Sequence, residues 1–404
     1  MSTLSEQILG APAGEYVDRE VDAAFAHDGT GVLAREALRE MGVERLSHPD
    51  RVHLIFDHIV PPNTSTTATL QAELRRYARS AGVAFSEAGG GICHQVMSEG
   101  RVRPGMVVVG ADSHTCTLGA FGAFATGVGA TDMAAIWASG ATWFRVPETI
   151  AVRLSGQLSG AAEPKDVALT YVAELGMEGA TYRALEFVGD GAAGISMDGR
   201  LTLCNMAVET GAKAGMFYPD ATTVRYLADH GVAASPRAPR EDCHYEREVE
   251  IDLADIVPLV AVPHRVDTVR EAEEVAGTHL DQVFVGTCTN GRYEDLARFA
   301  RIVRRKKVAV RTLVIPASRA VLARAIATGV LADIVDAGCM VATPGCGPCL
   351  GAHAGVLGEG EVCLSTANRN FKNRMGVGGE IYLSSATTAA ASALAGEIAV
   401  PEVV

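Results

Sequence analysis

Long apolar runs are missing from this sequence. No stretch reaches the roughly 18 uninterrupted apolar residues that cross a bilayer, and even the glycine- and alanine-rich segment of residues 119–141 contains Asp132. Residues 1–14 have no sustained apolar core, and Glu6 stands where a secretory signal carries basic residues. We therefore expect a cytoplasmic protein that does not enter a membrane.

Positive charge is also scarce. The formal net charge of -13 gives the chain no general attraction for nucleic acids or anionic membranes. One basic run occurs, at residues 301–307, at the end of a predicted helix. Cations there favour the helix dipole, so we interpret the run as a solvated helix end, with RNA binding as the alternative. An acidic substrate would need a local basic pocket.

Aromatic residues make up only 5% of the sequence, whereas glycine occurs 43 times and hydrophobic residues reach 48%. This composition is typical of a densely turned α/β protein and does not fit a disordered chain. With 404 residues the chain is long for one core, and we predict domains at residues 1–147, 148–264 and 265–404. The proline-rich residues 235–240 indicate a boundary or an exposed crossing.

The last block shows the clearest pattern. Its predicted elements are a strand at residues 282–286, a helix at 293–306, a strand at 308–315 and a helix at 318–328. Alternation of strands and helices predicts a parallel sheet. Cys288 would then follow the carboxyl end of a strand, where open α/β sheets place their ligands. Cys346 and Cys349 come after a further apolar run.

The nine cysteines are an odd number in a long chain without a secretory signal, which favours thiols and metal ligands over disulfides. A Cys-x-x-Cys loop can turn Cys346 and Cys349 toward one metal centre, and Cys288 offers a third ligand. Structural zinc and electron-transfer clusters normally take four ligands, whereas three leave a position open for chemistry. A redox dithiol and ordinary loop thiols are the alternatives for an isolated Cys-x-x-Cys.

Three segments carry a specific resemblance. Residues 285–292 (VGTCTNGR), 344–351 (PGCGPCLG) and 365–374 (STANRNFKNR) are similar, in this order, to signatures of the aconitase superfamily. The resemblance covers nearly the whole chain and is closest to the large subunits of 3-isopropylmalate dehydratase and homoaconitase. It implies three packed α/β domains around a central cluster cleft, without the family's swivelling fourth domain.

The resemblance also implies a cofactor. In the family, three cysteines, here Cys288, Cys346 and Cys349, hold a 4Fe-4S cluster with one open iron site. A hydroxyl is a poor leaving group, and a Lewis-acidic metal stabilises the charge that develops as its C–O bond breaks. The implied reaction is therefore removal and readdition of water, without a redox change.

Polar clusters in the first block are candidates for proton transfer. Asp57 adjoins His58, and a carboxylate beside a histidine stabilises the cationic, proton-donating form. A lone histidine is more often structural, but four such clusters occur: His27-Asp28, Asp57-His58, His94-Gln95 and Asp112-Ser113-His114. By resemblance, His58 protonates the departing hydroxyl with support from Asp57. The other candidates by resemblance are His94, Asp112 and His114 in catalysis, and His27 and Ser113 beside the substrate.

Residues of the later blocks complete the implied site. By resemblance, Asn205 and Asn368 donate hydrogen bonds to the cluster and Glu209 faces the open iron; without it, residues 204–212 would be interpreted as a buried helix. Arg369 and Arg374 supply the basic pocket, since arginine grips a carboxylate bidentately. The sequence departs from the family at Asn373, where relatives have glycine, but asparagine tolerates left-handed geometry.

The family's fourth domain supplies a catalytic serine and further arginines, so the resemblance implies a separate small subunit. The first hypothesis is a 4Fe-4S hydro-lyase that isomerises a 2-alkylmalate-type hydroxy-acid, in first place 3-isopropylmalate, as in leucine biosynthesis. Homoaconitase or another alkylmalate dehydratase is the alternative. Two other classes stay open: an RNA-binding iron-sulfur regulator, and a zinc-stabilised structural protein.

Overall fold

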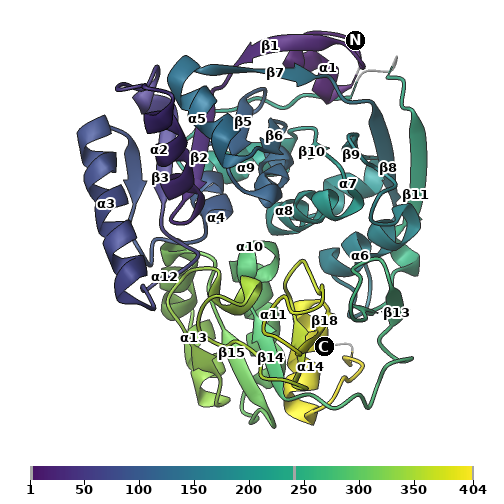
Figure 1. The fold of residues 1–404 in the computed structure, drawn as a ribbon. Helices are drawn as coiled ribbons and strands as arrows, with labels where there is room; N and C mark the ends of the chain where they lie inside the picture. Colours follow the sequence, from purple (N-terminus) through teal and green to yellow (C-terminus); the bar gives the residue numbers. More distant parts are fainter. Residues whose placement is uncertain (1–2, 240–242, 403–404) are drawn as a thin grey trace.

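The structure, a computed structural model, describes residues 3–239 and 243–402 and contains three parallel or largely parallel sheets (Figure 1). The first has the strand order β4-β3-β2-β5-β6, with every pair parallel. Its strands are β2 (Ala23–His27), β3 (Val52–Ile55), β4 (Ala84–Ser86), β5 (Val107–Gly110) and β6 (Phe124–Gly127). The helices of this part are α1 (Leu4–Leu9), α2 (Thr30–Glu40), α3 (Ser65–Ala81), α4 (Cys93–Ser98), α5 (Ala130–Ser139), and the 3-10 turns η1 (Pro49–Arg51) and η2 (Ser113–Phe121).

The topology of this sheet gathers polar residues at one edge. His27 ends β2, Asp57 and His58 follow β3, and Asp112 follows β5. Because these strands are parallel, their carboxyl ends meet at the same edge of the sheet. Strands β2, β3 and β5 thus place three of the four polar clusters side by side.

The second sheet has the order β10-β9-β8-β11, again with parallel pairs. Its strands are β8 (Thr149–Ser155), β9 (Ala184–Val188), β10 (Ala214–Phe217) and β11 (Arg247–Asp252). Its helices are α6 (Pro164–Leu175), α7 (Asp190–Gly194), α8 (Met197–Met206), α9 (Ala221–Asp229), and the turns η3 (Ala207–Thr210) and η4 (Leu253–Asp255). One buried cluster includes Phe25 and Leu118 from the first part and Phe187 and Leu203 from the second, so the two parts share a core.

The third sheet has the order β13-β12-β18-β17-β14-β15-β16. The parallel strands are β14 (Gln282–Val285), β15 (Arg311–Val314), β16 (Met340–Val341), β17 (Val362–Ser365) and β18 (Glu380–Leu383); β12 (Leu259–Ala261) and β13 (Val269–Glu271) are antiparallel. The helices are α10 (Thr287–Asn290), α11 (Tyr293–Val303), α12 (Arg319–Ala327), α13 (Val330–Asp336), α14 (Ala386–Ala395) and the turn η5 (Gly347–Leu350). The predicted α/β class and the parallel sheet are confirmed.

Two predicted boundaries in this part differ from the structure. The helix expected to reach residue 306 ends at Val303, and the strand expected from residue 308 begins at Arg311. The chain leaves α11 through Arg305, which has a left-handed φ of 59°. Residues 308–310 are therefore a connection, in which Ala309 N donates to Ala393 O instead of pairing with β14. Val308 and Val310 are half-buried and Ala309 is exposed in this connection.

The remaining strands, β1 (Tyr16–Glu20) and β7 (Ala141–Arg145), form a separate antiparallel ribbon. None of the helices in the described ranges combines the length and the apolar character needed to cross a bilayer. Residues 235–239 run exposed and without regular structure, whereas Arg240 of the expected proline-rich crossing lies outside the described residues. The division into domains at residues 147 and 264 stays a prediction.

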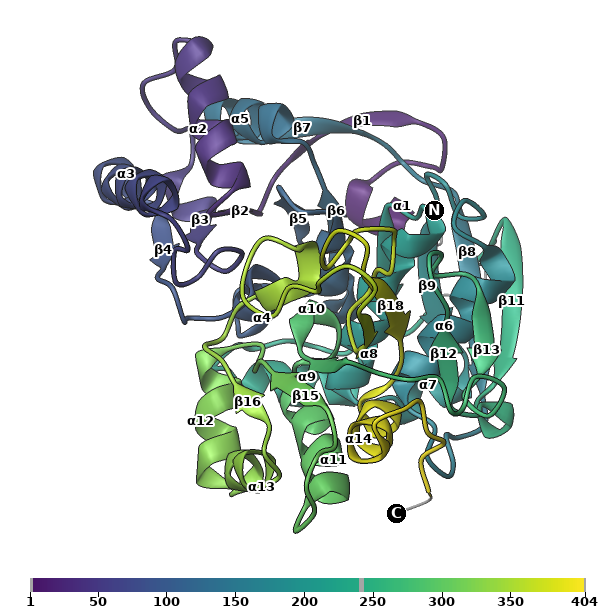
Figure 2. The same ribbon diagram turned by 60° about the horizontal axis from the view of Figure 1, so that its bottom comes forward.

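Figure 1 and Figure 2, which differ by a rotation of 60°, both place α10 near the centre of the molecule and close to α4. The third sheet thus presents the loop after β14 to the carboxyl edge of the first. The candidate site lies where these two edges meet.

Candidate functional site

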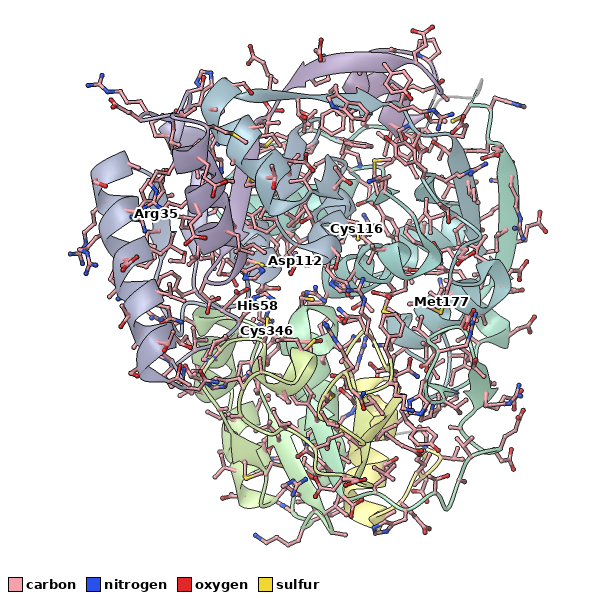
Figure 3. The ribbon with its side chains drawn as sticks, viewed as in Figure 1. Arg35, His58, Asp112, Cys116, Met177 and Cys346 are labelled. Atoms are coloured by element: carbon pink, nitrogen blue, oxygen red, sulfur yellow. The ribbon has the colours of Figure 1, made fainter. Side chains whose placement is uncertain are left out.

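The three cysteines singled out in the sequence come together in a small buried cluster with Ile92 and Ala317. Cys288 lies in α10, directly after β14, whereas Cys346 and Cys349 lie at the turn η5. Cys346 N donates to Asp57 O at 2.8 Å, which ties the Cys-x-x-Cys loop to the loop that carries His58. Figure 3 shows His58, Asp112 and Cys346 near one another between the first and the third sheet.

Two amide side chains point at the sulfur of Cys288. Asn205 Nδ2 donates to Cys288 Sγ at 3.2 Å, and Asn368 Nδ2 donates to the same atom at 3.5 Å. Asn205 is held in turn, because its Oδ1 accepts from Thr289 Oγ1 at 2.8 Å and from Asn368 Nδ2 at 3.1 Å. These contacts lie where the resemblance implied hydrogen bonds to a cluster. Buried amide donors around a sulfur favour its anionic, metal-binding form.

The ionisation of the thiols follows from their neighbours. Burial raises the pKa of Cys288, but the hydrogen bond and the charge of His94 outweigh it and bring the pKa down to about 6. Burial raises the pKa of Cys346 and of Cys349 above the usual value for a thiol. Cys288 is therefore the sulfur most ready to bind a metal, and the other two are thiols that a metal must ionise.

The spacing of the sulfurs discriminates between metals. Tetrahedral zinc holds its sulfurs at about 2.3 Å, so that two of them lie about 3.8 Å apart. Within the described ranges, the one set of three or more ligand atoms that fall within 4.8 Å of one another belongs to His27, Asp28, Asp57 and His58. The three sulfurs are thus more widely spaced than one zinc requires. Three soft thiolates that are spaced too widely for one zinc fit an iron-sulfur cluster.

The His27, Asp28, Asp57 and His58 set is built as a hydrogen-bond network. Asp28 Oδ1 accepts from His58 N at 2.9 Å, and Asp28 Oδ2 accepts from Ile59 N at 2.9 Å and from Gln71 Nε2 at 3.1 Å. Asp57 Oδ1 lies 2.6 Å from His58 Nδ1, and Asp57 Oδ2 accepts from Cys93 N at 2.6 Å. Because donors already occupy these oxygens, the set orients His58 and does not fit a cation site.

His58 is the clearest proton donor of the site. Burial lowers the pKa of His58, but the charge of Asp57, reinforced by hydrogen bonds to Asp57 and Asp112, raises it well above the ordinary value. His27 stacks on His58 with ring centroids 3.7 Å apart. Burial and the neighbouring His58 lower the pKa of His27 to about 4. One ring of the pair is therefore cationic at neutral pH and the other is neutral.

Asp112 links the histidines of three segments. Its Oδ1 lies 3.2 Å from His94 Nε2 and accepts from His114 N at 2.8 Å, and its Oδ2 lies 3.5 Å from His58 Nε2. Burial alone would raise the pKa of Asp112, but the charge of His94 and hydrogen bonds from the histidines hold it well below its usual value. Burial lowers the pKa of His94, yet Asp112 raises it to about 10.

Glu209 and Arg369 form a second hydrogen-bond network in the site. Glu209 Oε1 lies 2.8 Å from His114 Nε2 and accepts from Arg369 Nε at 2.8 Å. Arg369 Nη1 donates to Ser113 Oγ at 3.1 Å. Residues implied by resemblance in three separate segments thus share one network. The guanidinium is anchored through Nε and Nη1 and is partly accessible, with 19% of its side chain exposed.

Arg374 lies beside Cys349. Asn373 adopts a left-handed φ of 67°, so asparagine takes the geometry for which the relatives of the resemblance have glycine. Arg374 Nη2 lies 3.9 Å from Cys349 Sγ, and its Nε is buried without a hydrogen-bond partner among the residues that the structure describes. The structure places Arg374 beside the Cys-x-x-Cys loop, and its role in substrate binding stays a prediction.

Sequence patterns miss several contributing residues. Asp28 stands out only as a neighbour of His27. Gln71 and Thr117, whose Oγ1 accepts from Asn205 Nδ2 at 2.8 Å, carry no recognisable pattern. Thr289 lies within the VGTCTNGR segment, but its contact with Asn205 is not visible there. Lys165 and Arg292, two buried cations next to the Cys288 loop, are missed as well. Arg292 lies within the VGTCTNGR segment, so its position is visible in the sequence although its contacts are not. The contacts of Lys165 join residues 201 and 202 positions apart, and no local pattern reveals them.

The chain has known relatives in sequence and in fold. It is 55% identical to the probable methanogen homoaconitase large subunit of Methanosarcina mazei over 95% of its own length and 98% of that protein. It is 47% identical to the 3-isopropylmalate dehydratase large subunit 1 of Methanopyrus kandleri over 99% and 98%. The solved structure of Thermococcus kodakaraensis aconitase X (holo-form) has a TM-score of 0.54 at 13% identity, covering 90% of this chain and 86% of that one, which supports the fold alone.

A family model described as the aconitase family (aconitate hydratase) matches residues 5–396. The match spans all three sheets and every residue of the network around the cysteines. The chain belongs to the aconitase family.

Proposed function

We propose that the chain is the large catalytic subunit of a 4Fe-4S hydro-lyase that isomerises a 2-alkylmalate-type hydroxy-acid by removing and readding water. One observation carries the proposal: three buried thiols converge beside a cationic histidine that two carboxylates hold in place. The family and its dehydratase relatives imply an iron-sulfur cluster. The three-thiol arrangement supports a 4Fe-4S type with one open iron.

Cys288, Cys346 and Cys349 would hold the cluster, and Asn205 and Asn368 would donate hydrogen bonds to it. When bound, the cluster supplies a Lewis acid that weakens the C–O bond of a hydroxyl group. The chain's own residues supply the remaining functions. They protonate the leaving group, bind the substrate carboxylates and exclude water from the site at the carboxyl edge of the first sheet.

His58 would deliver the proton. Its Nδ1 is engaged with Asp57 Oδ1 at 2.6 Å, so Nε2 is the nitrogen left to face the cleft, 3.5 Å from Asp112 Oδ2. Asp57 keeps the ring cationic and correctly oriented, as the carboxylate does in other acid-base pairs. Asp112, His94 and His114 complete a charged network in which a water molecule can be held and deprotonated for the readdition step.

Substrate carboxylates would bind to Arg369 and Ser113, with His27 and Arg374 at the periphery. Glu209 fixes the Nε edge of Arg369 through both of its carboxylate oxygens. The remaining edge of the guanidinium can therefore face an anion.

We expect Arg369→Lys to raise KM about tenfold or more, because a lysine keeps the charge but not the fork that binds a carboxylate. Steady-state kinetics of the assembled enzyme would measure this. Arg265→Lys, which alters an exposed arginine paired with Asp267, is the matched control and should leave KM unchanged. A KM that is equally unchanged in Arg369→Lys would remove this residue from substrate binding.

A separate small subunit would complete the enzyme. Elimination needs a base on the carbon opposite the leaving hydroxyl, and we assign this base, the family's serine, to a partner that carries the swivelling domain. Relatives named large subunits support the assignment. A closing partner would also exclude water and add positive charge around a dianionic substrate.

The isolated chain should therefore bind its cluster and show little isomerase activity. Addition of the small subunit should restore turnover, measured as ultraviolet absorbance of the unsaturated acid at matched cluster content. Full activity of the chain alone would refute the two-subunit assignment. The base would then have to lie among the polar residues of this chain that border the cleft.

The substrate is 3-isopropylmalate in the first hypothesis. Homoaconitase chemistry is the second candidate, favoured by the 55% identity to a relative with that name. The assembled enzyme can be offered 3-isopropylmalate and homocitrate separately, and the larger kcat/KM identifies the substrate. 3-Isopropylmalate carries an alkyl side chain where homocitrate carries an additional carboxylate. Because the two substrates differ by a charge, we expect their kcat/KM values to differ strongly.

Two other features agree with an enzyme that acts on a small molecule. In the basic run at residues 301–307, Arg304 Nε lies 3.5 Å from Asp333 Oδ2 and forms an ion pair, and Lys307 Nζ donates to the backbone carbonyl of Asp336. This contact pattern fits a solvated helix end and gives RNA binding little support. The wide spacing of the sulfurs likewise argues against a structural zinc protein.

A further inference from the structure

Two buried cations contact the loop that carries Cys288. Lys165, at the start of α6, is 0% exposed, and Arg292, directly after α10, is 1% exposed. They reach the loop from different parts of the chain, since α6 belongs to the second sheet and α10 to the third (Figure 1). Neither residue has a role in the proton transfer or the substrate binding proposed above.

Lys165 connects two segments that bear site residues. Its Nζ donates to Ala367 O at 2.6 Å, to Thr366 O at 3.0 Å and to Asn290 Oδ1 at 3.3 Å. Residues 366 and 367 directly precede Asn368, which reaches Cys288 Sγ, and Asn290 ends the same helix as Cys288. One ammonium group therefore fixes the Asn368 segment relative to the Cys288 loop.

Arg292 closes the other end of the loop. Its guanidinium donates to Thr289 O at 2.5 Å and to Cys288 O, two carbonyls at the end of the short helix α10. Such carbonyls have no partner within the helix and need an external donor. Arg292 Nε also donates to Gln95 Oε1 at 3.2 Å, next to His94 in α4. The same side chain thus couples the cysteine loop to the histidine that lowers the pKa of Cys288.

The acceptors of both cations are neutral. Within the described ranges, the hydrogen bonds of Lys165 Nζ and of the Arg292 guanidinium go to carbonyl, amide and hydroxyl oxygens, and neither cation forms an ion pair. The two oxygens of Asp295 accept from Asn290 Nδ2 and Arg292 N. Burial lowers the pKa of Lys165 to about 8, which leaves the ammonium charged at neutral pH.

Asp295 is the carboxylate whose charge acts on both cations, but burial raises its pKa to about 7, so it offsets them only in part. Burying charge that is only partly offset is costly, and two cations around one metal-ligand loop favour a further anion beside it. A 4Fe-4S cluster with three thiolate ligands carries net negative charge and would lie next to this loop. Its charge would offset theirs in a region of low dielectric, where the attraction is strong.

We propose that Lys165 and Arg292 are positioning residues that fix the Cys288 loop and supply the positive charge that stabilises the bound anionic cluster. The inference rests on the proposed function, because it presupposes a cluster at the three cysteines. It adds two residues that do not contact the substrate. They act through their positive charge and through their hydrogen bonds to the protein backbone.

The test compares cluster loading with stability. Wild type, Lys165→Met and Arg292→Met would be prepared without a cluster and after anaerobic loading with iron and sulfide, and Tm would be measured in both states. A ligand that binds the folded state raises Tm according to its affinity. We expect a smaller rise in Tm on loading in both variants, and a more negative reduction potential of the loaded cluster, because loss of a nearby cation disfavours the added electron.

Controls separate charge from packing. Arg301→Met removes an exposed cation from α11 and should match wild type in both measurements. Arg292→Lys keeps the charge and should recover much of the lost rise in Tm. If Lys165→Met does not fold, Lys165→Gln, which keeps a donor, takes its place in the same comparison.

The outcomes are distinct. Variants that lower Tm equally with and without the cluster, at unchanged reduction potential, would show a merely structural role and overturn the inference. A wild-type chain that takes up no iron and sulfide would overturn the proposed function and this inference with it. Normal cluster uptake by the wild type, together with a smaller rise in Tm on loading in both methionine variants, supports the proposed function and this inference.

Discussion

Cys288→Ser, Cys346→Ser and Cys349→Ser should each prevent stable assembly of the 4Fe-4S cluster. The three sulfurs are the protein ligands of the proposed site, and a serine hydroxyl is a hard, protonated and weak ligand for iron. Loss at Cys288 should be the most complete, because its low pKa makes it the sulfur that is ionised first. Iron and acid-labile sulfide per chain, measured after anaerobic reconstitution, give the result together with the visible thiolate-to-iron absorption.

Cys363→Ser is the matched control for these variants. Cys363 is also fully buried in the third sheet, but it lies in β17 and its sulfur faces Gln282. This variant should keep its cluster, and Cys243→Ser should do so as well. Full cluster content in all three ligand variants would remove the cysteines from the site and with them the proposed chemistry.

His58→Ala should lose turnover while keeping its cluster. The proton donor and the metal ligands are different residues, and loss of general acid catalysis costs on the order of a hundredfold or more in rate. The kcat of the assembled enzyme at equal iron content measures the effect. His279→Ala changes an exposed histidine that also lies beside a carboxylate, Asp281 at 3.3 Å, and should leave kcat unchanged. An unaltered kcat in His58→Ala would exclude this residue from the mechanism.

The pH dependence gives a second readout of the same group. The charge of Asp57 raises the pKa of His58, so the proton-donating form persists below the raised pKa and is lost only as the pH rises through it. In Asp57→Asn that support is gone, and the alkaline fall in activity should move to lower pH. An alkaline limb that stays in place would show that His58 is not the group that titrates.

The sequence predicted those residues of the candidate site that lie in short, recognisable motifs. Cys288, Cys346 and Cys349 lie in glycine-rich loops after strands, and the resemblance placed Asn205, Asn368 and Glu209 with them. The structure brings these residues together, as the alternation of strands and helices in the last block required. Their individual roles remain proposals.

The parts that the sequence did not reveal depend on long-range contacts. Lys165 resembles an ordinary helix residue after Pro164, and only the packing of α6 against the third sheet shows that it reaches the backbone before Asn368. Likewise, the apolar residues 308–310 have the composition of a strand, but the pairing of β15 with β14 begins at Arg311, and Ala309 N donates to Ala393 O instead. A short apolar run does not by itself separate a strand from a connection.

Dependence of turnover on the cluster is tested most directly by one comparison. The same preparation of the chain would be divided, one half loaded anaerobically with iron and sulfide and the other left without, and both would be combined with the small subunit and 3-isopropylmalate or homocitrate. The unsaturated acid should form only with the loaded half, at a rate proportional to its cluster content. Equal formation by the half without a cluster would contradict a hydro-lyase built on Cys288, Cys346 and Cys349.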